Sequence, residues 1–164
     1  YLGLAFAKTL TKEQLNAARV LSERPIDVFE GPGQRGKLAQ YEGLSSADLS
    51  LEQLSALQHL TREFVENGNK NAAGEHLDAI AAAGWRKLWF AWQGPVSADA
   101  PFYYRVHGER ILIEYNLQDL NHDHAVVRDP ANDYGEDWLG AHLTEKHPSS
   151  LEVRQSLGLL PADE

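Results

Sequence analysis

The chain has 164 residues, a formal net charge of −9, 43% hydrophobic residues and 24% charged residues. This length suits one globular domain, and the acidic balance would repel a polyanion, so we expect no nucleic-acid partner. The absence of Cys excludes disulfides and thiolate sites, and no apolar run approaches the roughly 18 residues that a membrane helix needs.

The first part of the chain is predicted to be helical. Thr11-Lys12-Glu13-Gln14 has the form of a capping box, and the apolar residues after it predict a helix that closes at Arg24-Pro25. A second box, Ser50-Leu51-Glu52-Gln53, begins a stronger helix that ends at Gly68. A third helix is expected over residues 71–84.

A glycine-rich stretch lies between the first two predicted helices, at residues 30–36. Three glycines in a short run invite comparison with a phosphate-binding loop. However, no Gly-Lys-Ser/Thr ending follows, and no strand-like run comes before it. We therefore predict a plain surface loop here.

The character of the chain changes at Trp85, where aromatic and β-branched residues begin to predict strands. The predicted architecture is α+β, with N-terminal helices packed on a small antiparallel sheet and a C-terminal helix. The predicted strands are residues 88–92, 102–106, 111–115 and 124–128. We expect a single domain over 1–150, with a helical part at 5–84, a sheet part at 85–130, a C-terminal helix at 133–147 and a tail at 151–164.

A hairpin between the second and third predicted strands would separate a core face from a polar face. With a turn at Gly108-Glu109, Arg105 faces Leu112 and Tyr103 faces Glu114. The core face then holds Phe102, Tyr104, Val106, Ile111, Ile113 and Tyr115, and the polar face holds Tyr103, Arg105, His107, Arg110, Leu112 and Glu114. The polar face is where we expect chemistry.

Glu114 is the predicted centre of this polar face. If residues 119–123 form a loop, Glu114 pairs with Arg128 and lies between that arginine and Arg105. An opposite charge on each side would hold Glu114 ionised. If the protein is an enzyme, we expect Glu114 to act as a base or metal ligand and Tyr103 to donate a proton or a hydrogen bond.

The sharpest local motif is Asn121-His122-Asp123-His124. In extended chain, residues two apart point the same way, so His122 and His124 could converge on one metal ion. Neutral imidazoles suit zinc, copper or iron, so the implied cofactor is a divalent transition metal. The alternative is two exposed histidines at the end of a loop. Because a metal site needs three or four ligands, further ones are required. The candidates are His142, the preferred one, together with Glu114, Asp123 and His107.

Several runs in the second half of the chain resemble one family. They are Phe90-Ala91-Trp92-Gln93-Gly94-Pro95, Phe102-Tyr103-Tyr104-Arg105-Val106, Ile113-Glu114-Tyr115 and the stretch from His122 to Gly135. Their order and spacing resemble the C-terminal half of the domain-of-unknown-function family number thirty-five hundred, which occurs in bacteria and fungi. Residues 5–60 resemble the helical stretch that precedes it, so the resemblance covers nearly the whole chain.

The resemblance implies no particular reaction, but it does imply a cellular location and a type of assembly. Members are commonly exported, which implies a periplasmic or extracellular location. They are also longer than this chain, and the missing N-terminal half typically carries a Gly-His-His element. The remaining metal ligands would then lie on that half or on a second chain, which makes a heteromer the expected assembly. The lack of Met at position 1 agrees with a cleaved or two-chain protein, and equally with a shortened chain.

These observations leave three hypotheses open. The first is a metal-dependent enzyme, an oxidoreductase or hydrolase, that acts on a small or carbohydrate-like molecule. The second is a non-catalytic binding or assembly module, in which Glu114 and the arginines form a buried ion-pair network and the histidines contact a partner chain. The third is a pocket that recognises a carboxylate through Arg105 and Arg128 as a clamp.

Overall fold

The computed structural model describes residues 1–21, 23–32, 34, 36–131, 142 and 146. It divides the chain into two units, Tyr1–Asp133 and Tyr134–Glu164. All the elements below belong to the first unit. The predicted C-terminal helix at 133–147 and the tail at 151–164 lie almost entirely outside the described residues.

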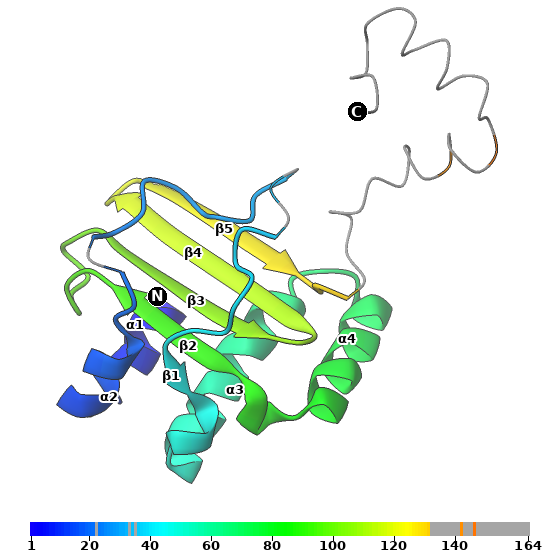
Figure 1. The fold of residues 1–164 in the computed structure, drawn as a ribbon, viewed down its shortest axis with the longest axis horizontal. Coiled ribbons are helices and arrows are strands. Elements are labelled where there is room, and N and C mark those ends of the chain that lie inside the picture. Colours follow the sequence, from blue (N-terminus) through cyan, green and yellow to red (C-terminus); the bar gives the residue numbers. More distant parts are fainter. Residues whose placement is uncertain (22, 33, 35, 132–141, 143–145, 147–164) are drawn as a thin grey trace, which may run out of the picture. The chain divides into compact units, whose positions relative to one another are not determined.

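The first unit combines helices with one antiparallel sheet, which confirms the predicted α+β class (Figure 1). Its helices are α1 (Leu2–Ala7), α2 (Lys12–Ala18), η1 (Ser46–Asp48), α3 (Leu51–Val65), α4 (Lys70–Ala83) and η2 (Trp85–Lys87). Its strands are β1 (Leu44–Ser45), β2 (Trp89–Gln93), β3 (Phe102–Gly108), β4 (Ile111–Asp119) and β5 (His122–Arg128). The five strands follow one another in the sheet in chain order, and β5 is an edge strand. No helix of the described residues has the length and apolar character needed to cross a membrane.

Both predicted capping boxes are present. The side chain of Thr11 accepts a hydrogen bond from the backbone N–H of Gln14, and Ser50 does the same for Gln53 at the start of α3. Helix α2 nevertheless ends at Ala18, well before the predicted end at Arg24-Pro25, because Arg19 adopts an extended conformation (φ −85°, ψ 96°). The chain leaves the helix there to cross the sheet.

The hairpin of β3 and β4 turns one residue later than predicted. The turn is formed by Glu109 and Arg110, so Arg105 pairs with Glu114 rather than with Leu112. The predicted register is therefore wrong by two residues. Because side chains alternate between the faces of a strand, a shift of two leaves each side chain on its predicted face.

The pairing of β4 with β5 also differs from the prediction. Both strands extend into the stretch predicted as a loop, and only Leu120 and Asn121 separate them. Glu114 consequently pairs with Val126, and Arg128 pairs with Leu112 instead of with Glu114. The predicted placement of Glu114 between two arginines of neighbouring strands is thus wrong in register.

The apolar face of the sheet packs on the helices and forms the core. The ring of Phe6 in α1 meets Phe90 edge to face, with centroids 4.7 Å apart. Trp92 is buried and stacks on Phe102 at 4.8 Å, so core packing accounts for this tryptophan. Gly3 allows α1 to approach the ring of Tyr104, because a Cβ at this position would overlap that ring.

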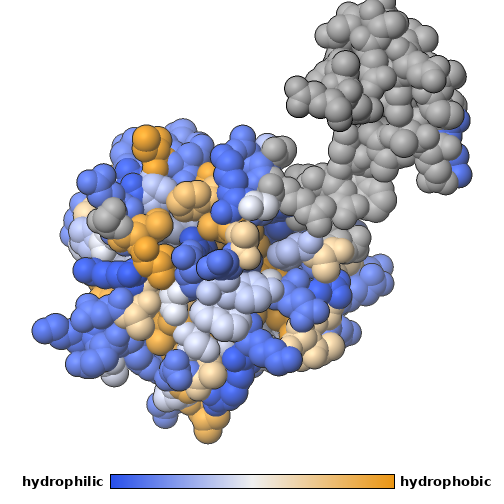
Figure 2. Space-filling model, viewed as in Figure 1, coloured by the Kyte–Doolittle hydropathy of each residue, from blue (hydrophilic) through white to orange (hydrophobic). Residues whose placement is uncertain are grey.

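The opposite face of the sheet is covered by a segment without helix or strand. This covering segment, residues 23–43 apart from Gly33 and Arg35, runs across the front of β3, β4 and β5 (Figure 1). Its outer surface mixes hydrophilic and hydrophobic residues (Figure 2). One of the hydrophobic residues, Ile26, is 89% exposed. The loop predicted at 30–36 belongs to this segment. Pro32, Gln34 and Gly36 are exposed, as a surface loop requires, while the side chain of Glu30 at the start of the loop is buried.

Gly43 joins the covering segment to β1 and offers a test of how closely the two fit. It has φ +107°, and a Cβ there would overlap the carbonyl of Phe90. We expect Gly43→Ala to lower the free energy of unfolding by about 2 kcal/mol, since backbone overlap adds to the strain of positive φ. Gly36 also has positive φ (+86°) but has nothing within 4 Å, so Gly36→Ala should cost about 1 kcal/mol. Urea denaturation gives the free energy of unfolding of both variants. Equal decreases in the two variants would contradict this account.

Candidate metal centre

The four predicted catalytic residues all lie on the sheet face beneath the covering segment. Tyr103 and Glu114 are 0% exposed, Arg105 is 1% exposed and Arg128 is 5% exposed. The structure therefore brings them together as predicted, but it buries them. Their catalytic roles stay predictions.

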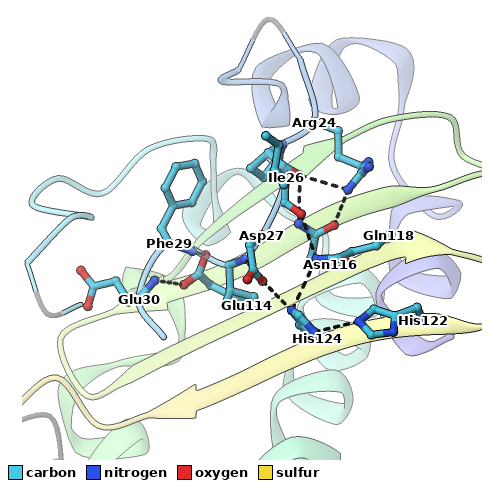
Figure 3. A network of polar contacts seen from close by, with 12 residues as sticks. Arg24, Ile26, Asp27, Phe29, Glu30, Glu114, Asn116, Gln118, His122 and His124 are labelled. Carbon is cyan, nitrogen blue, oxygen red and sulfur yellow. Dashed lines mark hydrogen bonds and ion pairs between the residues drawn. The ribbon is translucent and has the colours of Figure 1, made fainter. Parts of the chain in front are cut away.

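Glu114 binds the covering segment through hydrogen bonds to its backbone. One carboxylate oxygen accepts from the N–H of Phe29 (2.8 Å), and the other accepts from the N–H of Glu30 (2.8 Å) (Figure 3). The oxygen bound to Phe29 also accepts from the hydroxyl of Tyr103 (2.7 Å). Burial, and then the adjacent carboxylate, raise the pKa of Tyr103 far above its ordinary value. Tyr103 therefore acts here as a hydrogen-bond donor to Glu114.

The two buried arginines are paired with acids of the covering segment. A guanidinium nitrogen of Arg105 lies 2.7 Å from a carboxylate oxygen of Glu42, and one of Arg128 lies 2.8 Å from a carboxylate oxygen of Glu30. Each arginine is thus already engaged by a protein carboxylate. This arrangement gives no support to a bidentate clamp for an external carboxylate.

His107 lies on the same face, beside Arg105. Its side chain is buried, and its ring contacts the ring of Tyr41 with centroids 4.7 Å apart. Burial, and then the positive charge of Arg105, lower the pKa of His107 to about 4, so the imidazole is neutral at pH 7. Among the described residues, its Nδ1 atom has no hydrogen-bond partner.

Polar side chains of β4 fix the start of the covering segment above β5. The amide of Asn116 donates to the carbonyl of Pro25 (3.0 Å) and accepts from Arg24 (2.6 Å). The amide of Gln118 donates to the carbonyl of Ile26 (2.9 Å). These contacts place the next residue, Asp27, over β5 (Figure 3).

Asp27, His124 and His122 form a chain of polar contacts at the start of β5. A carboxylate oxygen of Asp27 lies 2.6 Å from Nδ1 of His124, and Nε2 of His124 lies 2.9 Å from Nε2 of His122 (Figure 3). The hydrogen bond from His124 is the main reason why the pKa of Asp27 lies below its ordinary value. An ionised carboxylate can only accept, so Nδ1 of His124 carries a hydrogen. In a neutral ring Nε2 is then the acceptor and can receive a hydrogen bond from His122.

The distance between the two Nε2 atoms is close to the distance expected between two imidazole nitrogens that bind the same metal ion. Imidazole nitrogens bound tetrahedrally to one zinc ion, at about 2.0–2.1 Å each, lie about 3.3 Å apart. The observed 2.9 Å needs only a small opening of the pair. A carboxylate on the remote nitrogen is also the common way to orient a metal-bound histidine.

The rest of a coordination sphere is not provided by the described residues, which contain no group of three His, Cys, Asp or Glu that could hold a metal ion. His107 and Glu114 are buried beneath the covering segment, and Asp123 accepts a hydrogen bond of 2.5 Å from the hydroxyl of Tyr115. His142 belongs to the second unit, so its membership in the site stays a prediction.

A cleft of about 660 Å³ opens beside the histidine pair, between the covering segment and β5. Asp27 and Lys37 line it from the covering segment, and Asp123 and His124 line it from β5. The alternation of His122 and His124 indicated this part of the site from sequence. Asp27 was missed, because it is 97 positions from His124 and no local pattern marks it.

The fold and the site define an α+β protein in which an irregular segment is bound across the polar face of an antiparallel sheet, with a histidine pair at the edge strand. The family described as "Protein of unknown function (DUF3500)" matches residues 1–136, and the chain belongs to this family. The comparisons with curated proteins and with solved structures gave no match.

Proposed function

We propose that this protein binds a divalent transition-metal ion, zinc, copper or iron, between the Nε2 atoms of His122 and His124. The observation that carries the proposal is the 2.9 Å separation of these atoms, together with the 2.6 Å contact of Asp27 to Nδ1 of His124. The carboxylate fixes the tautomer in which Nε2 of His124 is free to coordinate. A metal ion would take the place of the hydrogen that the two rings share.

Two histidines leave coordination positions open for water, a ligand, or a further protein side chain. A catalytic zinc ion usually has three protein ligands, so an enzymatic role requires at least one more. We propose that this ligand comes from outside residues 1–133, either from His142 or, in line with the family resemblance, from a second chain. We also propose, on the same basis, an exported protein.

A binding or assembly module is the second candidate function. The observation that favours it is the burial of Glu114, Arg105 and Arg128, each of which has a hydrogen bond or an ion pair with the covering segment. In both candidates these residues would hold the covering segment in place, and through it Asp27. Any chemistry would then occur near the cleft, which His124 lines.

Elemental analysis by plasma mass spectrometry tests the proposal on protein purified without chelator. We expect a near-stoichiometric metal in the wild type, and loss of that metal in a His122→Ala/His124→Ala variant. His59→Ala is the matched control, because His59 is exposed and lies in α3. In a zinc titration, Asp27→Asn should weaken binding by about 10- to 100-fold, the usual effect of removing a carboxylate that orients a ligand.

Two outcomes would reject the metal site. One is a wild-type protein with no metal above background and no saturable zinc binding. The other is a double variant that retains the metal. The binding or assembly module would then be the better account of the histidine pair.

A further inference from the structure

The two edge strands of the sheet differ in how much backbone they leave unpaired. β1, at one edge, has only two residues, whereas β5, at the other edge, has seven and pairs, among the described residues, with β4 alone (Figure 1). Short edge strands are a common protection against pairing with another chain, and so are lysine and proline residues within the strand. β5 contains neither lysine nor proline. It is therefore the edge at which a further strand can be added.

The register of the β3–β4 hairpin shows which backbone groups of β5 point away from β4. Gly108 pairs with Ile111 across a two-residue turn, so these two residues form a hydrogen-bonded pair. Hydrogen-bonded pairs alternate with non-bonded pairs along an antiparallel ladder, so Ile111 and every second residue after it bond to β3. Glu114 therefore belongs to the set that bonds to β5, where its partner is Val126.

The backbone groups at the open edge belong to the other set of residues in β5, namely Asp123, Ala125 and Val127. Among the described residues, the N–H and C=O groups of these three have no hydrogen-bond partner. Asp123 and Ala125 are also exposed. A strand placed beside β5 would find a row of free donors and acceptors there, which is the arrangement that binds peptides by strand addition.

The cleft of about 660 Å³ lies along this edge. Four consecutive residues of β5, 123–126, line it, although successive side chains of a strand point to opposite faces. The cleft therefore borders the edge of the strand and not one face alone. Its other wall is the covering segment, which contributes Val28 and Pro32. At about 3.3 Å per residue, the β5 wall offers about 13 Å of strand for pairing.

The lining favours an occupant with alternating apolar and basic residues. Its described charged residues are Asp27, Asp123 and Lys37, so two carboxylates outweigh one ammonium group. The chain as a whole also has a net charge of −9. An added residue opposite Asp123 shares its face of the sheet, where a basic side chain forms a favourable cross-strand pair. The next residue of the added strand faces the covering segment, where Val28 and Val126 line the cleft.

We infer that β5 binds an extended segment of another protein, which adds to the sheet as a further antiparallel strand and occupies the cleft. The segment has apolar residues on the side of the covering segment and basic residues on the other side. Its basic residues lie opposite Asp123, Ala125 and Val127, so their backbone groups form the hydrogen bonds to β5. The inference goes beyond the proposed metal site and does not depend on it.

Fluorescence anisotropy of a dye-labelled peptide, Lys-Val-Lys-Val-Lys, tests the inference with the full chain in the presence of EDTA. We expect saturable binding, and at least about tenfold weaker binding of Glu-Val-Glu-Val-Glu, because like charges face each other there. Methylation of the backbone nitrogens of the lysines should abolish binding, since these nitrogens donate to β5. Methylation of the valine nitrogens should be tolerated, since these point away from β5.

Two variants of the protein test the same contacts from the other side. Ala125→Pro removes an outward N–H and leaves the bonds to β4 intact, a placement that edge strands tolerate, and it should abolish binding. Asp123→Asn should weaken binding of the lysine peptide by about threefold. Asp78→Asn, at an exposed position of α4, is the matched control and should bind as the wild type does.

Several outcomes would overturn the inference. One is a lysine peptide that does not bind saturably, or that binds no better than the glutamate peptide. Another is unchanged binding after methylation of the lysine nitrogens or in Ala125→Pro. If Ala125→Pro does not fold, the methylated peptides decide. A chain that is dimeric without peptide and monomeric as Ala125→Pro would show that a second copy occupies the edge instead. Because EDTA is present throughout, none of these results bears on the metal site.

Discussion

Replacing Glu114 by alanine is expected to lower the free energy of unfolding by about 4 kcal/mol. The carboxylate is 0% exposed and accepts hydrogen bonds from the hydroxyl of Tyr103 and from the backbone N–H groups of Phe29 and Glu30. Alanine would leave these three donors unpaired in the interior and create a cavity between the sheet and the covering segment. Both effects favour the unfolded state.

The matched control is Tyr103→Phe, which removes one donor but keeps the carboxylate and both backbone contacts. It should cost about 1 kcal/mol, the usual net value of one hydrogen bond. Urea denaturation gives both values, and hydrogen exchange at Phe29 and Glu30 should become faster in Glu114→Ala than in Tyr103→Phe. If the alanine variant is no less stable than the phenylalanine variant, Glu114 does not hold the covering segment.

Lowering the pH from 7 to 4 is expected to reduce the free energy of unfolding by about 3 kcal/mol through His107 alone. The folded protein has a His107 pKa of about 4, while the unfolded chain has the ordinary value of 6.5. Below pH 6.5 the unfolded chain therefore takes up a proton that the folded protein resists. Stability falls as the pH drops from 6.5 through 4, and the loss levels off below that.

The contribution of His107 can be isolated by comparing variants, since other groups also titrate in this range. His107→Leu should show a smaller loss of stability than the wild type between pH 7 and pH 4.5, because leucine takes up no proton. His59→Leu, at an exposed position of α3, should follow the wild type. Equal pH dependence in His107→Leu and the wild type would show that burial of His107 does not resist protonation.

The sequence predicted the elements and faces of the sheet better than its register. Alternation placed Tyr103, Arg105 and Glu114 on one face correctly, because a shift of two residues does not change the face. The register itself depended on interpreting Gly108 as a turn residue. Gly108 has no positive φ and lies within β3, where a Cβ would collide with the side chain of Leu88. Its small size serves packing, which a turn pattern does not reveal.

The candidate site was predictable only on the strand side. The spacing of His122 and His124 indicates convergence, since it follows from strand geometry alone. The hydrophobic residues of the covering segment follow neither the period of a helix nor that of a strand. Its position across the sheet therefore could not be predicted from a sequence pattern. Asp27 could be found only after Asn116 and Gln118 had placed its neighbours.

The covering segment links the interior of the sheet to its edge. Asp27, which orients His124, is two positions before Phe29, whose N–H is bound by Glu114. A displacement of the backbone at Asp27 or at Phe29 is therefore expected to displace the other residue as well. If a metal ion binds the histidine pair, thermodynamic linkage requires that the coupling be reciprocal. The metal ion would strengthen the attachment of the segment by the same free energy by which a detached segment weakens metal affinity.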